Sequence, residues 1–209
     1  MDIHDIYRPF LLHFRRRRMS AFEQMFGLRS ETRVLDVGGT GFNWRLVGVR
    51  PRLVLLNLDA GERTSEDPEW VLADARHLPF ASSSFDIVCS NSVIEHLGTS
   101  ENQEHMAEEC RRVGRRYYVQ TPNKGFPIEP HLLTPFIHWL PRPIRRHLIR
   151  HFTLWGWVAR PSPEYCERFL QQTRLLGESD LLRMFPDAEI WKERFMGMVK
   201  SLIAVRRGN

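Results

Sequence analysis

Apolar residues in this chain gather in short continuous runs that alternate with segments of helical spacing. The runs lie at 32–38, 52–59, 69–75, 84–90 and 115–123. Continuous runs of this length, bounded by turn-forming residues, are typical of strands that are buried on both faces of a parallel sheet. The pattern therefore predicts five such strands.

Three segments between these runs are predicted to be helical. Apolar residues recur on one face over 8–26, and Gly27 is a plausible stop. A second helix is expected around 41–48. Ser100 and Gln103 form an expected capping box for a third helix over 101–113, in which Met106, Cys110 and Val113 share one face.

Strands that alternate with helices indicate a single α/β domain over 1–209, whose parallel sheet is covered by helices on both faces. Residues 1–30 form its N-terminal helical segment. The last apolar runs, within 188–207, have no helix between them and are expected to form a closing hairpin around Gly197.

One region interrupts this regularity after the fifth strand. Residues 126–163 are rich in proline, aromatic residues and arginine, and are too long for an ordinary connection in an α/β unit. We expect an inserted lid, bounded at 124–165, over the top of the sheet. Within it, 140–157 mixes apolar residues with arginines, which suits either a lid that packs on the domain or peripheral contact with a membrane surface.

Composition and charge bear on the partners of the protein and on its cellular compartment. The net charge is +5, with four arginines at 15–18 and five within 141–160, where there is no acid. The arginine run at 15–18 is most simply a solvated helix face, although such patches favour anionic partners. Three scattered cysteines do not make a disulfide framework, and the first residues do not resemble a secretory signal, so the cytoplasm is the expected compartment.

Candidate ligand-binding residues follow the first strand, where Gly38, Gly39 and Gly41 leave room for a ligand against the backbone. Asp59 follows twenty residues beyond Gly39, where an acid can bind a ribose diol. Trp44 stands where a dinucleotide-binding fingerprint needs its last glycine, and no phosphate-binding P-loop sequence is present.

Four stretches in order resemble the class I methyltransferases that use S-adenosylmethionine (SAM), most closely the ubiquinone/menaquinone-type group. They are VLDVGGTG (34–41), LLNLD (55–59), ADARHLPFASSSFDIVCSNSVIEHL (73–97) and YYVQTPN (117–123). The resemblance implies a Rossmann-like, mostly parallel seven-stranded sheet with an antiparallel last strand. It also implies SAM as cofactor and S-adenosylhomocysteine as product.

The resemblance assigns the cofactor loop to Asp36, Gly38, Gly39 and Gly41, and both ribose hydroxyls to Asp59. The family's usual loop is D-x-G-x-G-x-G, whereas this chain has D-V-G-G-T-G, one residue shorter before the last glycine. The helix therefore starts one residue early or the turn is tighter.

Four further positions match the family's cofactor contacts. Asp74 corresponds to the acid that faces the adenine amino group, and the backbone N–H of Ala75 to the donor for a ring nitrogen. Ser90 and Asn91, which end the fourth strand, correspond to positions that line the methionine moiety.

Glu129 and His131 are the candidate catalytic pair, because they follow the fifth strand where a methyl acceptor would dock, and a histidine can deprotonate a hydroxyl. A loop contact that only holds the insertion is the other interpretation. His96 is expected to be structural. The histidines show no metal-ligand spacing, and no metal is expected, because no dense cluster is formed by Glu95-His96 and the scattered His131, His138, His147 and His151.

The predicted function is transfer of the SAM methyl group to a small-molecule or lipid-linked acceptor. An exocyclic amine of DNA is disfavoured, because SNSV (90–93) stands where such enzymes carry an N-P-P-[YF] motif. Two alternatives stay open: a methyltransferase fold that acts as a binding or scaffold protein without catalysis, and an RNA methyltransferase, which the arginine patches suggest but which is not favoured.

Overall fold

A seven-stranded sheet forms the centre of the molecule. The computed structural model describes residues 8–59 and 68–208, with side chains from residue 12 onward. The strand order is β3-β2-β1-β4-β5-β9-β8, and β1 to β5 run parallel, while β9 is antiparallel to both of its neighbours. The strands are β1 (Arg33–Val37), β2 (Arg52–Asn57), β3 (Glu69–Leu72), β4 (Phe85–Asn91), β5 (Gly114–Pro122), β8 (Glu189–Phe195) and β9 (Met198–Arg206). The predicted Rossmann-like sheet is confirmed.

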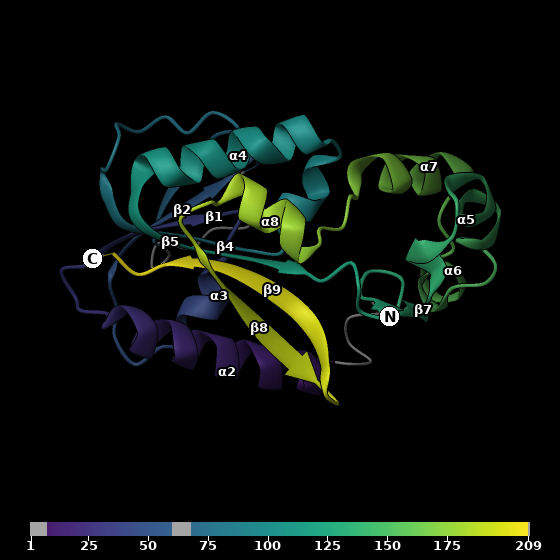
Figure 1. The fold of residues 1–209 in the computed structure, drawn as a ribbon, viewed down its shortest axis with the longest axis horizontal. Coiled ribbons are helices and arrows are strands. Elements are labelled where there is room, and N and C mark those ends of the chain that lie inside the picture. The colour runs from purple at the N-terminus through teal and green to yellow at the C-terminus, as the bar shows by residue number, and fades with distance from the viewer. Residues whose placement is uncertain (1–7, 60–67, 209) are drawn as a thin grey trace.

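Helices cover both faces of this sheet, as Figure 1 shows. The helices α4 (Ser100–Val113) and α8 (Glu178–Met184) lie on one face, and α2 (Arg8–Phe26) and α3 (Gly41–Trp44) on the other. Each face has its own apolar core. Met106, Cys110 and Val113 are fully buried in the first core, as their shared helical face predicts.

Two details of the helices correct the sequence-based expectations. Helix α3 ends at Trp44, so it is a single turn and does not reach 48. The N-cap of α4 is Thr99, whose hydroxyl accepts a hydrogen bond from the Asn102 N–H, so Ser100 is already helical. The Gln103 side chain is fully buried and donates to the carbonyls of Ile94 and Arg174, so it takes no part in a capping box.

The C-terminal hairpin forms as predicted, with β8 and β9 paired antiparallel. Its turn consists of Met196 and Gly197, whose φ angles are 48° and 81°. Two consecutive positive φ values give the turn type that matches the twist of a hairpin, and glycine accommodates one of them without steric strain.

Helix α2 changes the interpretation of the arginine run at 15–18. Arg16 and Arg17 are exposed, but Arg18 is buried and forms an ion pair with Glu193 of β8, with 2.9 Å between Nη2 and Oε2. The prediction of a solvated face is therefore wrong for Arg18. A buried ion pair needs good geometry and further hydrogen bonds, and Arg18 also donates to Gln120 on β5 at 3.1 Å.

The segment after β5 forms a small lobe with its own apolar cluster, which lies beyond the end of β5 in Figure 1. Its elements are β6 (Ile128–Glu129), β7 (Thr134–Pro135), the 3₁₀ helix η2 (Ile137–Trp139), α5 (Arg142–Leu148), α6 (Leu154–Ala159) and α7 (Pro163–Gln172). Cys166 and Leu170 of α7 belong to this cluster, so the lobe extends past the expected boundary at 165. Among the helices of the described residues, none combines the length and the hydropathy needed to cross a membrane.

Candidate functional site

The glycine turn after β1 is a place where side chains do not fit. Gly38 has a φ of 74°, and a Cβ on it would lie 2.4 Å from Val93. A Cβ on Gly39 would lie 1.8 Å from the carboxylate of Asp36. The Gly38 N–H donates to the Leu56 carbonyl at 2.7 Å, which attaches the turn to β2. The turn from β1 to α3 is therefore tight and has no side chains at these two positions. It lies at the carboxyl ends of the parallel strands, where α/β sheets bind ligands.

Asp36 supports this turn from the protein interior. Its carboxylate is buried and accepts a hydrogen bond from Trp44 Nε1 at 2.7 Å. Burial raises the pKa of Asp36 to about 6, although hydrogen bonds from Trp44 and Cys89 oppose the rise. The tryptophan that breaks the dinucleotide fingerprint thus has a structural role, because it closes α3 onto the acid beneath the loop.

Asp59 lies just beyond the carboxyl end of β2 and is exposed to solvent. Its neighbour Asn57 donates from Nδ2 to the Gly39 carbonyl at 2.8 Å, so the end of β2 and the glycine turn form one unit. Residues 60–67, which follow Asp59, lie outside the described part of the chain.

Asp74 has a partner, Arg76, to which the matched motifs give no role. Arg76 donates to the carboxylate from Nε at 3.0 Å and from its backbone N–H at 2.9 Å. The hydrogen bond from the Arg76 side chain is the main cause that lowers the pKa of Asp74 to about 2. Asp74 is therefore a fixed anion after β3, and the adjacent Ala75 is buried.

Ser90 and Asn91 close the end of β4 next to the glycine turn. The Ser90 hydroxyl donates to the Val37 carbonyl at 2.9 Å, which joins β4 to β1. The Asn91 side-chain oxygen accepts from Arg18 of α2. Helix α2 therefore reaches the carboxyl end of β4, where the methionine end of a bound SAM is expected.

A cavity of about 550 Å³ opens beside Asn91. It lies between α2, the ends of β4 and β5, the hairpin and the lobe. Its lining combines apolar side chains, among them Phe14, Phe126 and Leu133, with polar and cationic ones, among them Asn91, Gln120, Arg18 and Lys200. A cavity of this size and lining suits a small organic molecule.

Glu129 and His131 come together in the lobe, with 2.7 Å between Glu129 Oε1 and His131 Nδ1. Burial opposes protonation of His131, but the hydrogen bond and the charge of Glu129, with the charge of Glu95, raise its pKa above the ordinary value. His131 lines a different cavity from Asn91, one of about 470 Å³ that it shares with His96. Its role as a base stays a prediction.

The structure corrects the expectation that the histidines form no cluster. Glu95, His96 and His131 each place a ligand atom within 4.8 Å of the other two. Burial, together with the charge of His131, lowers the pKa of His96 to about 4, so its ring is neutral near pH 7. Burial also raises the pKa of Glu95 to about 7.

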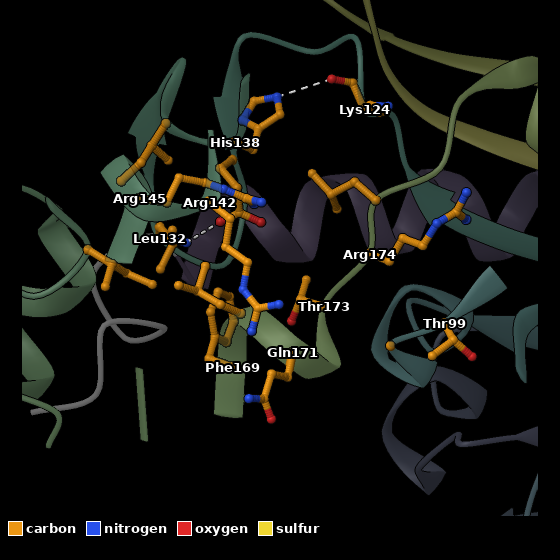
Figure 2. Close-up of a pocket in the computed structure, with 16 residues that line it drawn as sticks. Thr99, Lys124, Leu132, His138, Arg142, Arg145, Phe169, Gln171, Thr173 and Arg174 are labelled. Atoms are coloured by element: carbon orange, nitrogen blue, oxygen red, sulfur yellow. Dashed lines mark hydrogen bonds between the residues drawn. The ribbon is translucent and has the colours of Figure 1, made fainter. Parts of the chain in front are cut away.

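A third cavity, of about 560 Å³, lies between the lobe and the sheet domain. Figure 2 shows Arg142 and Arg145 on one side of it and Arg174 on the other. Lys124 also lines it, so cations outnumber the single acid of its lining, Glu129. Such a surface favours an anionic molecule.

Sequence reasoning missed three side chains around these sites. The arginine run predicts a solvated face for Arg18, the matched motifs give no role to Arg76, and Glu95 stands out only as the neighbour of His96. For Arg76, the spacing D-x-R after a strand was an available signal, because it allows a local bidentate pair. Arg18 and Glu95 contact residues that are distant in the sequence, so no local pattern predicts these contacts.

Comparison with known proteins shows which proteins this chain is similar to. The sequence profile described as "Methyltransferase domain" matches residues 31–116. The biotin biosynthesis bifunctional protein BioHC of Cellvibrio japonicus is 30% identical over 106 residues, which are 47% of this chain and 21% of that protein. The chain thus spans about a fifth of the length of this curated relative.

Two solved structures show the same fold. One is magnesium protoporphyrin IX methyltransferase from Synechocystis PCC 6803 with bound S-adenosylhomocysteine, with a TM-score of 0.54 and 14% identity over 91% of this chain and 83% of that one. The other is a SAM-dependent methyltransferase from Aquifex aeolicus, with a TM-score of 0.50 and 15% identity over 90% of this chain and 87% of that one. Residues 31–116 therefore match a methyltransferase profile, and the chain as a whole has the fold of these SAM-dependent methyltransferases.

Proposed function

We propose that this protein binds SAM at the carboxyl edge of β1, β2 and β4 and transfers its methyl group to a small-molecule or lipid-linked acceptor. The observation that carries the proposal is the glycine turn. At Gly39 a side chain would collide with Asp36, and at Gly38 with Val93. Glycine at both positions lets the turn pack directly against these two side chains, and this fixes the tight shape that we propose receives the cofactor.

Two acids complete the proposed cofactor site. Asp59, exposed at the end of β2, is available to accept hydrogen bonds from both ribose hydroxyls. Asp74, held by Arg76, offers a carboxylate for the adenine amino group beside the N–H of Ala75. SAM carries no phosphate, which agrees with the lack of a phosphate-binding loop in the sequence.

The cavity beside Asn91 is the proposed acceptor site. Its apolar wall supports an acceptor with an apolar body, and Asn91 places it next to the proposed methionine end of SAM. Methyl transfer from a sulfonium needs in-line alignment above all, and positioning of two reactants contributes roughly 7–11 kcal/mol to lowering such barriers. When SAM is bound, it supplies the activated methyl group, and the chain's own task is to orient the acceptor and exclude water.

Thermal unfolding with S-adenosylhomocysteine tests the proposal. Ligand at about 100 times its Kd stabilises a protein by roughly 2.7 kcal/mol, which corresponds to a rise in Tm of about 5–10 °C for a chain of this size. Asp59→Ala is expected to lose most of this rise. Glu108→Ala, which removes an exposed acid from the middle of α4, is the matched control and keeps it.

A folded parent protein that shows no rise in Tm would contradict the proposal. The alternative of a scaffold protein without catalysis would then be favoured. A rise that Asp59→Ala leaves unchanged would place the ligand elsewhere in the molecule.

A further inference from the structure

Three side chains with metal-binding atoms meet at the junction between the sheet domain and the lobe. Glu95 and His96 belong to the 3₁₀ helix η1 (Ile94–Leu97), which follows β4, and His131 lies between β6 and β7. One ligand atom of each lies within 4.8 Å of the other two. Two imidazoles and one carboxylate are a common ligand set for zinc and for other divalent transition metals.

One carboxylate oxygen of Glu95 has no hydrogen-bond donor among the described residues. Glu95 is fully buried, and its Oε2 accepts a hydrogen bond from the Thr121 hydroxyl at 3.0 Å. Its Oε1 has no hydrogen-bond partner among the described residues. A buried carboxylate oxygen without a donor is costly, and a cation between Glu95 and the two histidines would satisfy it.

His131 is oriented as metal-binding histidines commonly are. Its Nδ1 lies 2.7 Å from Glu129 Oε1, and Glu129 Oε2 accepts a hydrogen bond from the Leu132 N–H at 2.6 Å. Glu129 is itself buried. A carboxylate that holds one ring nitrogen in this way fixes the tautomer and leaves Nε2 as the ligand atom.

His96 completes the arrangement from the opposite side. Its ring centroid lies 4.7 Å from that of His131, and the rings are nearly perpendicular. Within the part of the chain that the structure describes, no hydrogen bond to the His96 ring occupies its nitrogens. Atoms that share one zinc ion at about 2.0–2.1 Å lie at most about 4 Å apart, so small side-chain rotations bring the three ligands together.

The cluster has an open side. His96 and His131 both line the cavity of about 470 Å³, whose other walls include Trp155, Tyr165 and Phe169. Glu95 is buried behind the two histidines and does not line this cavity. Catalytic zinc sites have three protein ligands, and their remaining position, which here would face the cavity, takes water or a substrate atom.

We infer that Glu95, His96 and His131 form a binding site for one divalent transition-metal cation of the zinc class, with an open coordination position toward this cavity. Glu129 is a positioning residue that orients His131. The inference is independent of the proposed SAM site, because none of these residues belongs to the glycine turn. If the metal binds, His131 is a ligand and does not serve as a free base.

Titration of the chelator-treated full chain with Zn²⁺ tests this inference, and Co²⁺ gives a spectroscopic reading of the same site. The expected result is one bound Zn²⁺ per chain and visible absorption from bound Co²⁺. Glu95→Gln retains an acceptor for Thr121, and His96→Gln keeps a polar side chain at the cavity wall. Each is expected to weaken Zn²⁺ binding by at least about 10-fold, since these residues bind the metal directly, and Glu129→Gln by about 10- to 100-fold.

His147→Gln, on the exposed face of α5, is the matched control and leaves binding unchanged. Circular dichroism shows whether each variant is folded, and His96→Gln decides the result if Glu95→Gln does not fold. Lack of Zn²⁺ binding by the folded parent protein would overturn the inference. Binding that both ligand variants leave unchanged would overturn it equally.

Discussion

At the scale of single residues, Asp36 links the sequence motif to the shape of the cofactor loop. Its carboxylate lies beneath Gly39, so close that a Cβ there would be 1.8 Å away. Trp44 donates to the same carboxylate at 2.7 Å. The acid is therefore a support for the turn, and its short distance from Gly39 explains why this shortened loop needs glycine at that position.

The burial of Asp36 predicts a pH effect on stability. Burial raises its pKa from 3.8 to about 6, so between these values the folded state binds more protons than the unfolded state. Stability from this group is therefore lost as the pH rises from about 4 to about 6, by roughly 3 kcal/mol in total.

Urea unfolding at several pH values measures this effect. Asp36→Asn keeps an acceptor for Trp44 and cannot ionise, so the parent protein should lose stability relative to the variant by roughly 2 kcal/mol from pH 4 to pH 7, the rest of the effect falling below pH 4. The exposed Glu108→Gln serves as the control and should show no such trend. A constant difference between parent and Asp36→Asn would contradict the assignment.

The same scale shows what the sequence could not reveal. The residues of the glycine turn were found because a ligand-binding turn leaves a local pattern. The cluster of Glu95, His96 and His131 was missed, since His131 is brought to the other two only by the fold of the lobe. Likewise, Arg18 sits in an arginine run, and only the packing of α2 against β8 distinguishes it from its exposed neighbours.

At the scale of elements, the apolar runs predicted every strand of the main sheet. The central strands β1, β4 and β5 are buried along most of their length and so leave continuous runs, while the edge strands β3 and β8 are only partly buried. Helix boundaries were harder to predict. The N-cap of α4 is Thr99, one residue before the expected Ser100. The Gln103 side chain donates to two carbonyls in the interior and is therefore not available for a capping box. The small elements of the lobe have no strong period, so the sequence indicated an insertion without its internal structure.

Some side chains of the segment 140–157 pack into the core of the lobe, while others are exposed to solvent. Ile149 is fully buried in the lobe and Trp155 packs against the same cluster. In contrast, Phe152 is 66% and Trp157 65% exposed. Arginines lie in the same segment, so its outer side combines aromatic and cationic groups, as surfaces that contact anionic membranes do.

This outer side predicts binding to anionic vesicles if the acceptor is lipid-linked. Cosedimentation with phosphatidylglycerol vesicles should be reduced several-fold in the double variant Phe152→Glu, Trp157→Glu, because two apolar anchors become negative charges. Leu182→Glu changes an exposed apolar residue on α8 and is expected to bind as the parent does. A parent protein that stays in solution with these vesicles would favour the packed-lid interpretation.

At the scale of the whole molecule, the proposed sites lie along one edge of the sheet. The glycine turn and Asp59 follow β1 and β2, Asn91 is the last residue of β4, and the lobe continues from β5 at the same carboxyl-terminal side of the sheet (Figure 1). Parallel strands present their carboxyl ends together, so residues far apart in the sequence converge there. The methyl donor would lie against the sheet domain, while the acceptor cavity is shared by α2, the hairpin and the lobe.

The most direct test of this account is a calorimetric titration of the protein with S-adenosylhomocysteine, run beside the same titration with NADH. The glycine turn and the Trp44 position predict one S-adenosylhomocysteine per chain and no measurable binding of NADH. Tighter binding of NADH, or no heat with S-adenosylhomocysteine in a folded protein, would contradict the central claim that this edge of the sheet is a SAM site.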